Sequence, residues 1–189
     1  MKKVLKALLI TIVLIMAIGI IGSFFYSKNE IKSDSSGKPD TTVVKNPSVK
    51  EPQWIYETQE DKINDSKIYF AHVDANELLD FKFPYDGGVT ASILLRKWNN
   101  KTEAMLTITK GQFMPNTMEN HRIKVKFDNE KAESYLYTDP SDGSSTIAFI
   151  SNAKKFISKL KNSKVVIVEC EFFEEGTRTM EFKTDGLKW

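Results

Sequence analysis

The side chains best suited to acid–base or nucleophilic chemistry are few in this sequence, and they lie far apart along it. The two histidines, His72 and His121, are 49 residues apart, and neither belongs to an HExxH pattern. The chain also lacks the GxSxG pattern of a serine hydrolase and the GxxxxGK[ST] phosphate-binding loop. We therefore predict that the protein is not an enzyme. The alternative is an envelope hydrolase, because the residues of a catalytic triad can be far apart in the sequence and still meet in the folded protein.

Two acidic segments could bind a cation, and each also has a structural explanation. Asp139 and Asp142 precede Gly143-Ser144-Ser145 as in a calcium loop, but the EF-hand ligand order and its closing glutamate are missing. We interpret this segment as a turn between strands. The second segment contains Glu169, Glu171, Glu174 and Glu175. Pairing of these acids with lysines on neighbouring strands is favoured over a cation site, so we predict no metal and no cofactor.

The one cysteine limits redox and metal chemistry. A lone cysteine excludes a disulfide within the chain and any cysteine-rich metal site. Cys170 lies two residues from both Val168 and Phe172, so it shares the apolar side of an alternating segment. We expect a buried, unreactive thiol.

Aromatic side chains are the other candidates for a functional surface. The tyrosines and tryptophans of the second part of the chain are Trp54, Tyr56, Tyr69, Tyr85, Trp98, Tyr135, Tyr137 and Trp189. A core of this size cannot bury all of them fully, and Tyr and Trp are enriched at binding surfaces. We predict an exposed binding surface that contains Tyr85, Trp98, Tyr135 and Tyr137. Tyr85 is the best candidate for a loop contact, and the alternative is that it packs under its own turn.

Charge is unevenly distributed along the 189 residues, whose formal net charge is +2. The first 26 residues carry three lysines and no acid, and residues 27–52 carry five lysines and four acids. Residues 53–189 therefore hold 19 basic and 21 acidic residues. A mildly acidic domain lacks the basic footprint of nucleic-acid binding, so no nucleic-acid partner is predicted.

The N-terminal segment predicts a membrane anchor. Residues 7–26 are uncharged and almost wholly apolar, and as a helix they would span about 30 Å, the thickness of the hydrocarbon core of a bilayer. A cleaved signal peptide is the alternative, although its apolar region is usually shorter. Lysines within residues 1–6 predict a short cytoplasmic tail, an inner-membrane location and an exported C-terminal domain. Residues 27–52 are polar, and we predict a disordered linker.

Residues 53–189 have the pattern of short strands separated by turns. Ile123, Val125 and Phe127 alternate with basic residues within 122–127, which predicts a strand with one buried face. Turn residues such as Asn99-Asn100 separate consecutive alternating segments, as in antiparallel hairpins. We predict an all-β, antiparallel sandwich, or a barrel-like fold, of eight to nine strands.

One amphipathic helix interrupts these strands. Its apolar residues are Ala153, Phe156, Ile157 and Leu160, which share one face, and Ser151 or Asn152 is positioned to cap its N-terminus. Its other faces carry Lys154, Lys155, Lys159 and Lys161. We interpret these lysines as a solvated face, with a phosphate- or lipid-headgroup-binding face as the alternative.

Several short motifs occur together along residues 54–189. They are Trp54 with Asp61, Asn76 before Phe83-Pro84-Tyr85, Leu95-Arg96, Gly111-Gln112-Phe113, Lys126-Phe127-Asp128, Asp142-Gly143-Ser144-Ser145, Phe156-Ile157 and Gly186-Leu187-Lys188-Trp189. This set resembles a group of uncharacterised exported proteins of bacteria and prophages. Many members of the group have a cysteine pair near the Gly-Gln-Phe loop, which this chain lacks. The domain is also similar, more loosely, to accessory proteins of type VI secretion. Neither resemblance implies catalytic residues.

These patterns together predict a membrane-anchored envelope protein that binds through its exported domain. The expected partners are the membrane, through the N-terminal helix, and another envelope protein, as for a prophage-encoded exclusion factor. A hydrolase and an accessory protein of a secretion apparatus are the alternatives.

Overall fold

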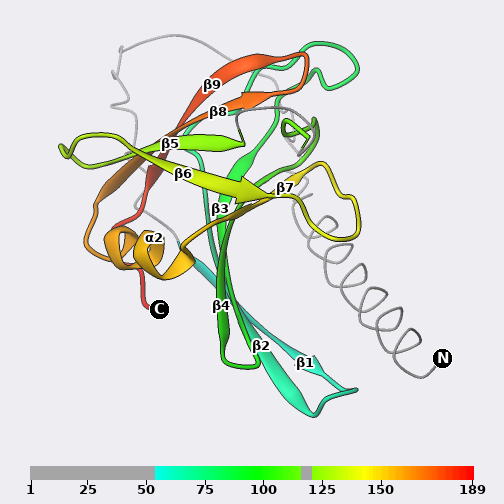
Figure 1. Cartoon of the computed structure of the whole chain (residues 1–189), viewed down its shortest axis with the longest axis vertical. Helices are drawn as coiled ribbons and strands as arrows, with labels where there is room; N and C mark the ends of the chain where they lie inside the picture. The colour runs from blue at the N-terminus through cyan, green and yellow to red at the C-terminus, as the bar shows by residue number, and fades with distance from the viewer. Residues whose placement is uncertain (1–53, 116–120) are drawn as a thin grey trace, which may run out of the picture. The chain divides into compact units, whose positions relative to one another are not determined.

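The computed structural model describes residues 54–115 and 121–189, which contain nine β-strands and one short helix (Figure 1). The elements are β1 (Ile55–Asp61), β2 (Ser66–Asp74), β3 (Ala91–Trp98), β4 (Lys101–Ile108), β5 (Arg122–Phe127), β6 (Glu133–Thr138), β7 (Ile147–Ile150), α2 (Ala153–Leu160), β8 (Val165–Phe172) and β9 (Gly176–Lys183). No helix within these described residues is long and apolar enough to span a membrane. The predicted tail, membrane helix and linker (1–6, 7–26 and 27–52) lie outside them.

The nine strands form one antiparallel sheet in the order β1-β2-β3-β4-β7-β6-β5-β8-β9. The predicted all-β antiparallel fold of eight to nine strands is therefore confirmed. The predicted sandwich or barrel-like arrangement is realised as one open sheet and not as a closed barrel, because β1 and β9 are at opposite ends of the strand order and do not pair with each other. Strand β6 makes the transition between the two halves: Glu133–Leu136 pair with β5, whereas Tyr137 and Thr138 pair with β7.

Tight turns explain why neighbouring strands pair. Trp98 and Lys101 are opposite each other across the β3–β4 hairpin, and both turn residues between them have positive φ values, 46° at Asn99 and 61° at Asn100. Asparagine tolerates this left-handed backbone better than most residues, which is why the dipeptide predicted the hairpin correctly. The β4–β7 and β5–β8 pairs join strands that are far apart in the sequence.

The hydrophobic core lies on one face of the sheet. Directly paired residues share a face, and one such row across β2, β3 and β4 consists of Val73, Ile93 and Leu106, all of them buried. The next row outward contains Ala71, Leu95 and Ala104, which are also buried. The opposite half of the sheet supplies further buried residues to the same cluster, among them Val125, Val168 and Phe182.

Side-chain and loop contacts hold the two edges of the open sheet together. The Trp54 indole N–H, just before β1, donates to the Thr184 carbonyl oxygen, just after β9, at 3.0 Å. Asn76, after β2, binds Glu181 of β9 twice: through its backbone N–H to the carbonyl oxygen and through its side-chain amide to the carboxylate, both at 2.8 Å. The first and last parts of the open sheet are therefore connected by these hydrogen bonds.

Helix α2 covers the core with the face that its sequence predicted. Phe156, Ile157 and Leu160 are buried, and the helix contacts β4. Of the two predicted N-cap residues, Ser151 and Asn152, Asn152 occupies the N-cap position, but the expected side-chain cap is missing. Its backbone is left-handed (φ 57°, ψ 45°), and its side chain makes no capping hydrogen bond.

Candidate binding groove

Two of the four aromatic residues predicted to form an exposed surface are core residues instead. Tyr135 is 4% exposed and Tyr137 is 2% exposed, because alternate residues of β6 face the core. The Tyr137 hydroxyl donates to the Met114 carbonyl oxygen at 3.2 Å, so its polar end is satisfied inside the fold. Burial raises the pKa of Tyr135 to about 12. The prediction that these two tyrosines are exposed is therefore wrong.

The other two predicted residues are far apart: Tyr85 lies in the loop before β3, and Trp98 is the last residue of β3. Tyr85 is half-buried against the core, and its hydroxyl accepts a hydrogen bond from the Gln112 side-chain amide at 2.9 Å. Tyr85 therefore packs against the core and the segment after β4, rather than forming an exposed loop contact or packing only under its own turn. Trp98 is also half-buried, with its indole N–H 3.3 Å from the Ser66 hydroxyl.

The residues considered for catalysis or cation binding have structural surroundings. His72 is buried in β2, and the Nε2 atom of His121 lies 2.9 Å from the Pro115 carbonyl oxygen. Asp142 accepts the backbone N–H of Ser144 at 3.0 Å, as expected for a turn. Within the described residues, no group of three or more His, Cys, Asp or Glu side chains could hold a metal ion.

The predicted pairing of acids with lysines on neighbouring strands is confirmed at one position. Glu169 of β8 and Lys124 of β5 are directly opposite each other, and their charged atoms are 2.8 Å apart. Glu175 instead accepts the backbone N–H of Lys82 at 2.9 Å and lies 3.3 Å from Arg178. These contacts account for part of the acidic segment without a bound cation.

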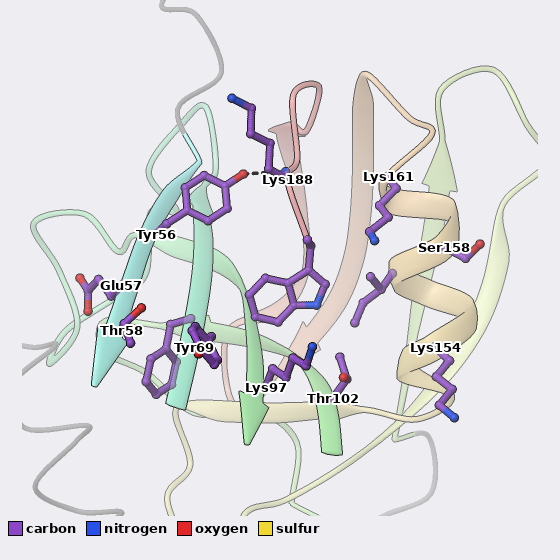
Figure 2. A pocket seen from close by; sticks show the side chains of 13 residues that line it. Tyr56, Glu57, Thr58, Tyr69, Lys97, Thr102, Lys154, Ser158, Lys161 and Lys188 are labelled. Carbon is purple, nitrogen blue, oxygen red and sulfur yellow. Dashed lines mark hydrogen bonds between the residues drawn. The ribbon is translucent and has the colours of Figure 1, made fainter. Parts of the chain in front are cut away.

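A groove of about 680 Å³ lies between the sheet and helix α2 (Figure 2). We call it the α2 groove. Its lining residues are Tyr56, Glu57, Thr58, Tyr69, Phe70, Lys97, Thr102, Lys154, Ile157, Ser158, Lys161, Lys188 and Trp189. Three segments contribute to it: the sheet, the helix, and the end of the sequence after β9.

The floor of the α2 groove is a row of side chains across four strands. Each residue of this row is directly opposite the next one on the neighbouring strand, so all four share one face of the sheet. The row runs from Thr58 on β1 through Tyr69 on β2 and Lys97 on β3 to Thr102 on β4. This is the core face, one row beyond the buried residues of β2–β4. Tyr69 is 44% exposed, so here the core gives way to a polar, aromatic surface.

The helix wall of the α2 groove carries cations. Lys154, Ser158 and Lys161 follow an i, i+4, i+7 spacing, and all three line the groove. Figure 2 shows Lys161 directed toward the strand that carries Lys97, and Lys154 and Ser158 directed to the other side of α2. Lys155 and Lys159 lie on another side and are held by acids. Lys155 Nζ is 2.7 Å from a Glu133 carboxylate oxygen, and Lys159 bridges Glu130 and Glu133. The helix thus separates neutralised lysines from lysines that line the groove.

A hydrogen bond to β1 positions the segment after β9. The backbone N–H of Lys188 donates to the Tyr56 hydroxyl at 2.8 Å. Tyr56 is on the same strand face as Thr58, so this contact holds Lys188 beside the sheet, next to Trp189, which also lines the groove. The Lys188 side chain extends away from the groove (Figure 2). Trp189 is half-buried and packs against the core.

The charges of the α2 groove are unbalanced. Four lysines (Lys97, Lys154, Lys161 and Lys188) line it, against one acid, Glu57. In the part of the chain that the structure describes, none of these four ammonium groups forms an ion pair. Alternation along β1 places Glu57 on the opposite strand face from Tyr56 and Thr58. The groove therefore presents uncompensated positive charge beside exposed aromatic rings.

Most of these residues stand out in the sequence, but no sequence pattern places them together. Tyr56, Tyr69 and Trp189 were among the aromatics that the core could not fully bury, yet none was assigned to the predicted surface. The i, i+7 spacing of Lys154 and Lys161 on α2 was a readable signal, since it separates them from Lys155 and Lys159. Which strand row faces α2 depends on the register of four strands, and no local pattern gives that.

Comparison with known proteins identifies no relative. No protein-family model matches this sequence, and no curated protein and no solved structure is detectably similar to it. The functional proposal therefore depends on the groove itself and on the N-terminal sequence.

Proposed function

We propose that this chain is a single-pass inner-membrane protein, of bacterial or prophage origin, whose exported β domain binds another envelope component. In this proposal the N-terminus is cytoplasmic and the domain is a binding module rather than an enzyme. The membrane part rests on the apolar run of residues 7–26 and on the lysines that precede it.

The observation that carries the binding proposal is the α2 groove. Lys155 and Lys159 are neutralised by acids of the same domain, whereas four other lysines gather around the groove with a single acid. These four lysines line one concave surface and form no ion pair within the described residues, so they are available to an external anion. Tyr56 and Tyr69 add exposed rings of the kind enriched at binding surfaces. The combination supports recognition of a negatively charged partner.

Photo-crosslinking in intact cells tests this function. A photoreactive amino acid in place of Tyr69 should form adducts with an envelope component, and the double substitution Lys154→Glu/Lys161→Glu should suppress them. The matched charge control is Lys126→Glu/Lys131→Glu, since both lysines are exposed and lie outside the groove. A photoreactive residue at Leu136, 47% exposed on β6, is the positional control.

Two results would contradict the proposal. One is equal adduct formation from positions 69 and 136, and the other is adduct formation that does not depend on the charges of Lys154 and Lys161. Circular dichroism of each purified variant checks that the fold is retained.

A further inference from the structure

The α2 groove has features that restrict the chemistry of its ligand beyond a negative charge. The proposed function requires only an anionic partner, whereas the floor combines charge with aromatic rings and hydroxyl groups. Tyr56 and Tyr69 are each 44% exposed, and Trp189 also lines the groove. Hydroxyl side chains stand on both sides, from Thr58 and Thr102 on the sheet and Ser158 on the helix.

We propose that the α2 groove binds an anionic glycan, a chain of sugar rings that carries carboxylate or phosphate groups. This inference rests on the proposed binding function and specifies its ligand. The apolar C–H face of a sugar ring can stack on a tyrosine or tryptophan ring. Sugar hydroxyls can exchange hydrogen bonds with Thr and Ser hydroxyls, which both donate and accept. The acid groups then meet the lysines.

The identity of the cations favours this ligand over a peptide that is recognised by its carboxylates. The described lining contains lysines and no arginine, so the planar, two-pronged geometry that matches a carboxylate is missing. Lysine acts as a point charge with three rotatable donors. Lysines spaced along a helix and across a sheet therefore suit anionic groups repeated along a flexible polymer.

The backbone at the centre of the floor also disfavours an added peptide strand. A peptide that extends a sheet needs unpaired backbone N–H and C=O groups at a strand edge. At the centre of the floor, β2 and β3 are hydrogen-bonded to strands on both sides at Tyr69 and Lys97. A ligand that lies across these two strands meets only side chains, with their rings, hydroxyls and ammonium groups. The side chains of the groove would therefore recognise the sugar rings and the acid groups of the ligand.

Fluorescence anisotropy with defined probes tests the inference on the full chain in a mild detergent. The anionic glycan probes are labelled oligogalacturonate, which carries carboxylates, and labelled phosphorylated dextran, which distinguishes phosphate as the source of charge. The comparison probes are neutral dextran, polyglutamate of matched charge, and glycerophosphoglycerol as a free lipid headgroup. We expect at least one anionic glycan to bind more tightly than every comparison probe.

Two substitutions separate charge from stacking. Lys154→Gln/Lys161→Gln should weaken glycan binding roughly 5- to 30-fold, as expected for two lost charge contacts at a solvated site, whereas Lys126→Gln/Lys131→Gln should not. Tyr69→Leu keeps an apolar side chain but removes the ring. It should weaken binding of the glycan and leave the weaker binding of polyglutamate unchanged.

The outcomes distinguish failure of this inference from failure of the proposed function. Equal binding of polyglutamate and glycans, with no effect of Tyr69→Leu, would overturn the glycan and leave a groove that recognises an acidic protein. Preferential binding of glycerophosphoglycerol would overturn it in favour of a lipid headgroup. If no probe binds but the adducts at position 69 still depend on Lys154 and Lys161, only the ligand class is wrong. If those adducts are also absent, both proposals fail.

Discussion

Single residues in this domain show how strongly burial determines chemistry. Cys170 lies on the core-facing side of β8, is 1% exposed, and has a pKa that burial raises to about 12. A thiol with such a pKa stays protonated at neutral and mildly alkaline pH, and the protonated form is a poor nucleophile. The sequence-based prediction of a buried cysteine is confirmed.

We predict that Cys170 does not react with a thiol reagent in the native protein. At pH 8 a disulfide reagent such as DTNB should release no chromophore over minutes, and one equivalent should be released after unfolding in urea. The chain has one cysteine, so the signal belongs to this residue. Rapid release of chromophore from the folded protein would show that β8 opens readily, contrary to its central place in the core.

Ion pairs between residues distant in the sequence hold helix α2 against the sheet, and local sequence patterns do not predict them. Glu133, on β6, binds both Lys155 and Lys159 of α2. The hydrogen bond from Lys155, followed by that from Lys159, lowers the pKa of Glu133 from its usual value of 4.5 to about 2. These contacts attach the lysine-rich side of the helix to the sheet and leave Lys154 and Lys161 to the groove.

This depressed pKa predicts how the stability of the domain depends on pH. The contribution of Glu133 is complete above its unfolded pKa of about 4.5 and is lost as the pH falls toward the folded value of about 2. Glu133→Gln should therefore destabilise the domain at pH 7 but have progressively less effect between pH 4.5 and 2. Chemical denaturation at pH 7, 4 and 3 measures the difference. A difference that is constant over this range would show that the ion pairs do not stabilise the fold.

For the strands and the helix, the sequence predicted local structure well, but it did not predict which strands pair when they are distant in the sequence. The strand over residues 122–127, the Asn99-Asn100 hairpin and the apolar face of α2 follow from period and turn chemistry, which act over a few residues. The β5–β8 pair joins segments about 40 residues apart, and turn signals carry no information about such a partner. Tyr135 and Tyr137 were misplaced because alternation shows that two residues share a face, not which face is buried.

The whole domain depends on a contact between its two ends. The Trp54 indole is 9% exposed and donates to the Thr184 carbonyl oxygen, 130 residues further along the chain. Thr184 also donates its hydroxyl to the Ser163 carbonyl oxygen at 2.9 Å, so the chain after β9 is fixed from two sides. The contact completes the core that the open sheet leaves accessible at its edges.

We predict that Trp54→Phe destabilises the domain by about 1–3 kcal/mol, because the Thr184 carbonyl oxygen loses its buried donor while most apolar contact is kept. Trp54→Ala should cost about 3–5 kcal/mol, since it also leaves a cavity. Trp98→Phe is the matched control, because its indole is only half-buried and makes a longer hydrogen bond, and it should cost less than about 0.5 kcal/mol. Urea denaturation followed by circular dichroism gives the values. Equal effects of the two Phe substitutions would contradict the closing role of Trp54.

The Trp54–Thr184 contact has a consequence for the order in which the chain is made. A ribosome releases Trp54 about 130 residues before its partner, so the β1–β4 region is available long before the strands that complete its core. Contacts between residues so distant in sequence also slow folding, because the loop between them must be closed first. During that interval apolar side chains of the early strands stay accessible to other chains. A premature stop before β9 would therefore yield an aggregation-prone fragment, not a smaller folded domain.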